Sequence, residues 1–148
     1  TFGGYVATSQ YVRELLINSS KQFIYTSAIP SHLCRAAMAA ISVTTQGLRQ
    51  KRLSKNINYF MQGLKKLGVV TPQFASPIIP IMIGNEVVST QIARRLLKMG
   101  IFVQAIRYPT VRRGRAQLRV SITSEHTIED LDFAISCLEK VRSKSKFM

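Results

Sequence analysis

Arginine dominates the part of the chain whose residue types suggest chemistry, residues 107–123, with the sequence RYPTVRRGRAQLRVSIT. A Pro-Thr turn and a glycine lie among the arginines, and an alternating apolar pattern follows. Guanidinium groups bind carboxylates and phosphates, so three interpretations are open: a nucleic-acid surface, a solvated basic loop, or a site built around one arginine. The five arginines are Arg107, Arg112, Arg113, Arg115 and Arg119.

Strand alternation separates one of these arginines from the others. Successive side chains of a β-strand point to opposite faces, so Leu118, Val120 and Ile122 share one face. Arg119 then points the other way, together with the hydroxyls of Ser121 and Thr123. If Arg119 is buried it needs an anionic partner, and a bidentate carboxylate suits it. The arginines of the preceding turn are expected to be surface charges.

Apolar periodicity predicts the elements that position these side chains. A spacing of three and four residues is typical of amphipathic helices, and short apolar or alternating runs are typical of strands. The predicted strands are residues 3–9, 22–30, 76–84, 101–108 and 116–123, and the predicted helices are residues 10–20, 32–43, 53–67, 86–99 and a last one from 128.

Several helix ends are marked by capping residues. Asn85 is predicted to cap the helix that follows it, because its side chain can accept hydrogen bonds from the first turn. Gly68 and Gly100 are predicted to end helices. Thr127 and Asp130 have the three-residue spacing of a capping box, with Asp in the place of the usual Glu or Gln.

The order of elements predicts the fold class, α/β. From residue 76 it is strand, helix, strand, strand, helix, which indicates a small two-layer unit with its sheet covered on one face. Pro77 and Pro80 indicate either an edge strand or the start of a strand. Residues 1–30 are interpreted as the edge of a different, larger domain. Residues 31–75 are a helical connection, and residues 76–148 are the small α/β domain.

Composition bounds the classes of function. The 148 residues have a net charge of +14, which favours anionic partners. No apolar run is long enough to span a membrane. Cys34 and Cys137 lack metal-ligand spacing and are predicted to be reduced, mostly buried thiols. His32 and His126 are isolated, so they are interpreted as helix-start or surface residues rather than catalytic bases. No metal site is expected.

At this point the motifs resemble a known family. The segments GGYVATS, FIYTSAIP, GIFVQAIRYPTV and AQLRVSITSEHT follow the order and spacing of the α-oxoamine synthases. These are pyridoxal-phosphate enzymes of the aspartate-aminotransferase fold (fold type I). The resemblance covers nearly the whole chain but corresponds to the C-terminal portion of a family member. It implies the cofactor pyridoxal 5'-phosphate (PLP), a homodimer and a cytoplasmic location.

The resemblance also implies residue roles. Arg119 matches the arginine that binds the carboxylate of the amino-acid substrate, and Thr110 matches a threonine that lines the substrate site. Thr26 and Ser27 match the hydroxyl pair that reaches the cofactor phosphate of the partner subunit. The family's cofactor lysine would lie upstream of Thr1, so no catalytic residue is assigned on this chain. We therefore expect the chain alone to be inactive.

The resemblance implies a decarboxylating condensation of an amino acid with an acyl thioester. It is strongest to the branch that makes 8-amino-7-oxononanoate from L-alanine and pimeloyl-CoA, or its carrier-protein thioester, in biotin synthesis. Relatives of glycine C-acetyltransferase or 5-aminolevulinate synthase remain alternatives. Tyr108, Arg112 and Gln117 depart from the usual family residues, which leaves the acyl-chain preference open.

A basic α/β nucleic-acid-binding module is the alternative of a different class. It explains the net charge and the arginine cluster, but it does not explain the GGYVATS and FIYTSAIP segments or the strand position of Arg119. Aromatic residues among the arginines are also few, since only Tyr108 lies inside the cluster. Neither nucleic acid nor a membrane is therefore expected as a partner.

Overall fold

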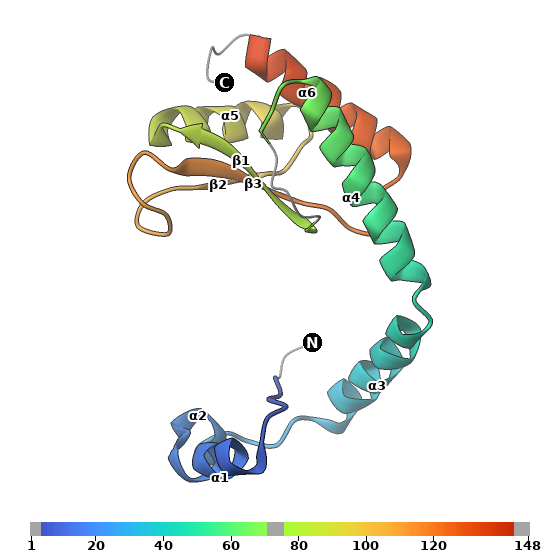
Figure 1. Cartoon of the computed structure of the whole chain (residues 1–148), viewed down its shortest axis with the longest axis vertical. Helices are drawn as coiled ribbons and strands as arrows, with labels where there is room; N and C mark the ends of the chain where they lie inside the picture. Colours follow the sequence, from blue (N-terminus) through green and yellow to red (C-terminus); the bar gives the residue numbers. More distant parts are fainter. Residues whose placement is uncertain (1–3, 71–75, 144–148) are drawn as a thin grey trace. The chain divides into compact units, whose positions relative to one another are not determined.

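The computed structural model describes residues 4–70 and 76–143 (Figure 1). Gly3, the first residue of an expected strand, and the last five residues of the chain lie outside this range. The elements are α1 (Gln10–Ser19), α2 (Lys21–Ile24), α3 (Ser31–Thr45), α4 (Leu48–Lys66), β1 (Ile78–Gly84), α5 (Glu86–Lys98), β2 (Gln104–Ile106), β3 (Ala116–Ser121) and α6 (Ile128–Ser143).

The chain divides into two compact units, Thr1–Gly47 and Leu48–Met148. The division falls inside the helical connection expected at residues 31–75, because α3 belongs to the first unit and α4 to the second. The domain boundaries expected after residues 30 and 75 concern the complete protein and stay a prediction.

The first unit is helical, and the two strands predicted in it are wrong. The part of residues 3–9 that is described has no regular structure, and residues 22–30 begin in α2 and continue as an irregular segment. A strand needs a neighbour to pair its backbone groups, and no other strand is described in this unit. The backbone of the apolar run at α2 forms helical hydrogen bonds instead: the Tyr25 N–H donates to the Lys21 carbonyl at 3.0 Å.

The second unit is built on a three-stranded antiparallel sheet in the order β1-β3-β2. In the register, Ile79 pairs with Val120, Ile81 pairs with Leu118, and Ala105 also pairs with Leu118. These side chains share one face, which α5 covers (Figure 1). The predicted two-layer arrangement is confirmed, and β1 is an edge strand as its prolines predict. Strand β2 is shorter than predicted.

One hydrophobic core joins the helices to the covered face of the sheet. Helix α4 packs against α6, and α6 packs against α5. At the α4–α6 contact, a side chain in place of Gly63 would meet the end of the Ile135 side chain, which would have to shift. The largest fully buried apolar side chains are Phe60, Leu64, Ile79, Ile81, Ile92, Leu96, Leu118 and Leu131. Each contributes about 1.5–3 kcal/mol by burial, so the second unit contains the stabilising core.

The caps predicted in this unit are confirmed. The Asn85 side chain accepts hydrogen bonds from the N–H groups of Val87 and Val88, at 2.9 and 3.0 Å. Gly68 and Gly100 follow α4 and α5 with positive φ angles of 73° and 88°, a conformation that glycine adopts without strain. Both helices therefore end where the glycines predict.

The two cysteines differ from each other. Both are free, and Cys137 is buried in the core as predicted. Cys34 is exposed on α3, so its predicted burial is wrong: α3 has no buried residue, because nothing described in the first unit covers it.

Candidate functional site

The candidate site lies on the face of the sheet that α5 does not cover, called here the open face. Alternation along β3 turns Gln117, Arg119 and Ser121 toward this face, opposite the buried side chains of Leu118 and Val120. The register adds residues of both neighbouring strands, Pro80, Met82, Gln104 and Ile106. Within the second unit, no described helix packs on this face.

Arg119 lies at the centre of the open face. It is on the central strand, and its register partners are Pro80 on one side and Gln104 on the other. The predicted direction, away from the core, is confirmed, and the side chain is exposed in the described chain. No carboxylate of the described residues is within ion-pair distance of it. Its donors are therefore available to an anionic ligand.

A loop over residues 107–115 joins β2 to β3 beside this face. The Tyr108–Pro109 peptide is cis, and Gly114 has a positive φ of 74°. The Arg115 N–H donates to the Arg112 carbonyl at 3.0 Å, which closes the tight turn before β3. The loop is therefore locally organised by its own backbone.

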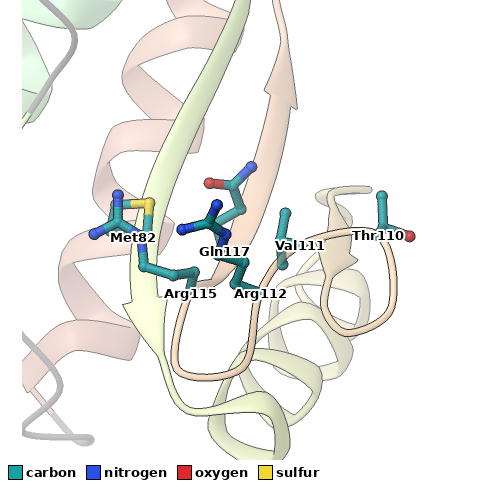
Figure 2. A pocket seen from close by; sticks show the side chains of 6 residues that line it. All are labelled: Met82, Thr110, Val111, Arg112, Arg115 and Gln117. Carbon is teal, nitrogen blue, oxygen red and sulfur yellow. The ribbon is translucent and has the colours of Figure 1, made fainter.

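A pocket of about 680 Å³ lies between this loop and the open face. Figure 2 shows the six side chains that line it, namely Met82, Thr110, Val111, Arg112, Arg115 and Gln117. Thr110 was predicted as a site residue and lines the pocket. Arg119 does not line it, but it is two residues along β3 from Gln117 and on the same face.

Sequence reasoning missed the other polar residues of this pocket. It treated Arg112 and Arg115 as surface charges; both are exposed, and both line the pocket. The alternation of β3 was the signal that could have found Gln117, because it lies on the same face as Arg119. Met82 had no such signal, since only the strand register brings it opposite Gln117.

The remaining predicted site residues lie in the first unit. Thr26 and Ser27 are exposed in the irregular segment after α2. The Thr26 hydroxyl donates to the Ser27 carbonyl at 3.4 Å, the long end of hydrogen-bond range. Two neighbouring exposed hydroxyls suit donation to phosphate oxygens.

Comparison with known families decides the class of protein. A model of the aminotransferase class I and II family matches residues 2–138. The chain belongs to this family. The resemblance inferred from the motifs is thus confirmed, and so is the family cofactor, PLP. The family fold predicted from the sequence, PLP fold type I, is confirmed by the structures below.

One curated relative and two solved structures illustrate the match. An 8-amino-7-oxononanoate synthase of Thermosipho melanesiensis is 39% identical over 143 residues, covering 96% of this chain and 37% of the relative. The structure of the same enzyme from Francisella tularensis has 26% identity and a TM-score of 0.75, covering 95% of this chain and 41% of that one. A serine palmitoyltransferase (SPT) solved with PLP has 22% identity and a TM-score of 0.84, covering 94% and 36%.

The chain therefore spans little more than a third of the curated relatives that it matches, and corresponds to their C-terminal part. The residues of this chain fit some groups of PLP and not others. Arginine, threonine and glutamine at the open face offer hydrogen-bond donors to carboxylate and phosphate oxygens. No lysine is among the pocket-lining residues, so this pocket offers no amine to the cofactor aldehyde.

Within the described ranges, 4–70 and 76–143, no helix is both long and apolar enough to cross a membrane.

Proposed function

We propose that this chain forms the substrate-binding, C-terminal part of a PLP-dependent acyltransferase that condenses an amino acid with an acyl thioester and releases carbon dioxide. The proposed substrates are L-alanine and a pimeloyl thioester of CoA or a carrier protein, as for an 8-amino-7-oxononanoate synthase of biotin synthesis. The position of Arg119 at the centre of the open face is the observation that supports this best.

Arg119 holds the carboxylate of the amino acid in this proposal. A guanidinium offers two parallel N–H donors that match both carboxylate oxygens, so it fixes orientation as well as position. The strand supports this role, because β3 is paired on both sides and its side-chain directions are set by the sheet. Arg119 therefore contributes orientation rather than proton transfer.

The other proposed residues complete the site. Bound PLP supplies an electron sink for negative charge at the amino-acid α-carbon. Thr26 and Ser27 donate hydrogen bonds to the cofactor phosphate held by the partner subunit of a homodimer, and Thr110 lines the substrate site. Because the chain spans little more than a third of its curated relatives, we expect the 148 residues by themselves to bind substrate groups without turnover. A cytoplasmic location is part of the same proposal.

The experiment compares the steady-state kinetics of the native protein with those of its Arg119→Ala variant. The Michaelis constant for L-alanine should rise about 10- to 100-fold, since a hydrogen bond to a charged group contributes about 1.5–3 kcal/mol. The Michaelis constant for the acyl thioester should change less than about twofold. Replacement of Arg94, an exposed arginine on α5, by alanine is the matched control and should leave both constants unchanged.

Equal effects of the two arginine replacements on L-alanine would contradict the role of Arg119. Replacing L-alanine by glycine in the same assay addresses the amino-acid identity. A higher kcat/KM with glycine would favour a glycine C-acetyltransferase or 5-aminolevulinate synthase activity over the proposed one.

A further inference from the structure

Two cations of the 107–115 loop face the pocket. Figure 2 shows Arg112 and Arg115 reaching from the loop toward the sheet, Arg112 beside Gln117 and Arg115 beside Met82. Among the described residues, no carboxylate lies within ion-pair distance of either guanidinium. Like charges brought to one pocket repel each other, and a bound anion removes that repulsion.

The third arginine of this turn is arranged differently. The guanidinium of Arg113 lies over the ring of Tyr108, 4.6 Å from its centroid, and Arg113 does not line the pocket. A cation over an aromatic face is attracted by the ring electrons. Arg112 and Arg115 therefore face the pocket, whereas Arg113 contacts Tyr108. Replacing Arg113 removes the same charge from the loop without removing a pocket residue, so it is the control for the effect of charge.

The pocket combines these donors with an apolar wall. Met82 and Val111 offer surface to methylene groups, whereas Gln117 and the two arginines offer N–H donors. A volume of about 680 Å³ is within the range of small-molecule pockets. The arrangement suits a chain of methylene groups that ends in an anion.

This pocket is separate from the position of Arg119. Gln117 lies two residues before Arg119 on β3, so their Cα atoms are roughly 7 Å apart along the strand. Arg119 is not among the lining residues. Two negatively charged groups can therefore bind at the open face at once, one at each place.

We infer that Arg112 and Arg115, together with Gln117, form an anion-binding subsite that recognises a negative group of the acyl thioester substrate. This assignment rests on the proposed function. The shared chemistry is a carboxylate or phosphate held by guanidinium donors. Its source is either the terminal carboxylate of the acyl chain or a phosphate of coenzyme A, and the experiment separates the two.

The test measures dissociation constants of three probes for the 148-residue chain by isothermal titration calorimetry. Pimeloyl-pantetheine has a terminal carboxylate and no phosphate. Heptanoyl-pantetheine has the same number of acyl carbons and no charge, and coenzyme A has phosphates and no acyl group. The variants are Arg112→Gln, Arg115→Gln and the control Arg113→Gln. All three side chains are exposed, and circular dichroism verifies that each variant is folded.

A carboxylate subsite predicts that pimeloyl-pantetheine binds about tenfold more tightly than heptanoyl-pantetheine, as expected for a charge-assisted hydrogen bond. Arg112→Gln and Arg115→Gln abolish this preference, and Arg113→Gln keeps it. A phosphate subsite predicts equal binding of the two pantetheine thioesters and weaker binding of coenzyme A to the same two variants. Either pattern supports the subsite.

Two results would overturn the subsite. The first is that all three arginine variants weaken the binding of a probe equally, which would indicate an effect of overall positive charge. The second is that no anionic probe binds, or that Arg112→Gln and Arg115→Gln leave the dissociation constants of all anionic probes unchanged. The proposed function is tested separately, by assaying condensation with the native protein. Absence of condensation with L-alanine while the anion preference persists refutes the function alone. Normal condensation with no effect of Arg112→Gln or Arg115→Gln on the thioester Michaelis constant refutes the subsite alone.

Discussion

At the residue scale, one buried polar side chain connects α4 to the turn that precedes α6. Asn56 is only 4% exposed, and its amide nitrogen donates to the carbonyls of Thr123 and His126 at 3.0 and 2.8 Å. Within the same turn, the Thr123 N–H donates a hydrogen bond to Nδ1 of the His126 ring, at 3.2 Å. His126 is therefore part of the turn just before α6, the helix-start position expected from the sequence.

Replacing Asn56 by alanine should lower the free energy of unfolding by about 1–3 kcal/mol, because two carbonyls at a partly buried contact lose their donor. Equilibrium denaturation of the chain measures this loss. Asn58→Ala is the matched control: Asn58 is exposed on the same helix, and its replacement should stay within about 0.5 kcal/mol. Similar losses in both variants would show that the two Asn56 hydrogen bonds do not explain the effect, because alanine favours a helix more than asparagine does.

The arginines show how far single residues are predictable. Alternation alone gave the direction of Arg119, because a strand allows only two side-chain directions. Arg112 and Arg115 belong to a loop, where no periodicity fixes direction, so sequence reasoning left them as surface charges. Their shared pocket follows from the turn geometry and from the strand that lies beside it.

At the element scale, α6 begins at a reciprocal capping box. The Thr127 N–H donates to the Asp130 carboxylate at 2.9 Å, and the Asp130 N–H donates to the Thr127 hydroxyl at 3.2 Å. The backbone hydrogen bond, followed by the side-chain one, lowers the pKa of Asp130 below its ordinary value. The predicted box is confirmed, with the shorter Asp in the place of Glu or Gln.

Acid should remove the contribution of this box to stability. A carboxyl with a lowered pKa stabilises the folded state above its ordinary pKa, and the contribution is lost as pH falls through the lowered, folded-state value. The difference in unfolding free energy between the native chain and Asp130→Asn should therefore be largest above about pH 5 and shrink below about pH 4. Denaturation across this range measures it. A difference that stays constant, or grows in acid, would refute the assignment.

At the scale of the whole molecule, the two units differ in what stabilises them. Every residue of the core cluster belongs to the second unit. Helices α1, α2 and α3 have no buried residue, and large apolar side chains such as Tyr5, Tyr25 and Met38 are 70% exposed or more. Such a unit does not bury enough apolar surface by itself to offset its conformational entropy.

A chain reduced to residues 48–148 should fold by itself, and its denaturant midpoint should equal that of residues 1–148, because it keeps the whole core cluster.

Limited proteolysis of the longer chain should cut first within residues 4–47. The fluorescence of an apolar dye should fall when those residues are removed, since exposed apolar surface binds such dyes. Failure of residues 48–148 to fold would show that the first unit stabilises the second.

The sequence by itself determined the helices, the caps and the fold class of the second unit, because these depend on local periodicity and on side chains within four residues of one another. It also determined the family, through motifs that lie along nearly the whole chain. The tertiary structure decided what needs a partner distant in sequence. Residues 4–9 and 22–30 have strand-like sequences, but the described part of their unit contains no strand to pair with them. Met82 meets Gln117 only through the register of β1 on β3. Strand pairing is a non-local interaction, so no short segment encodes it alone.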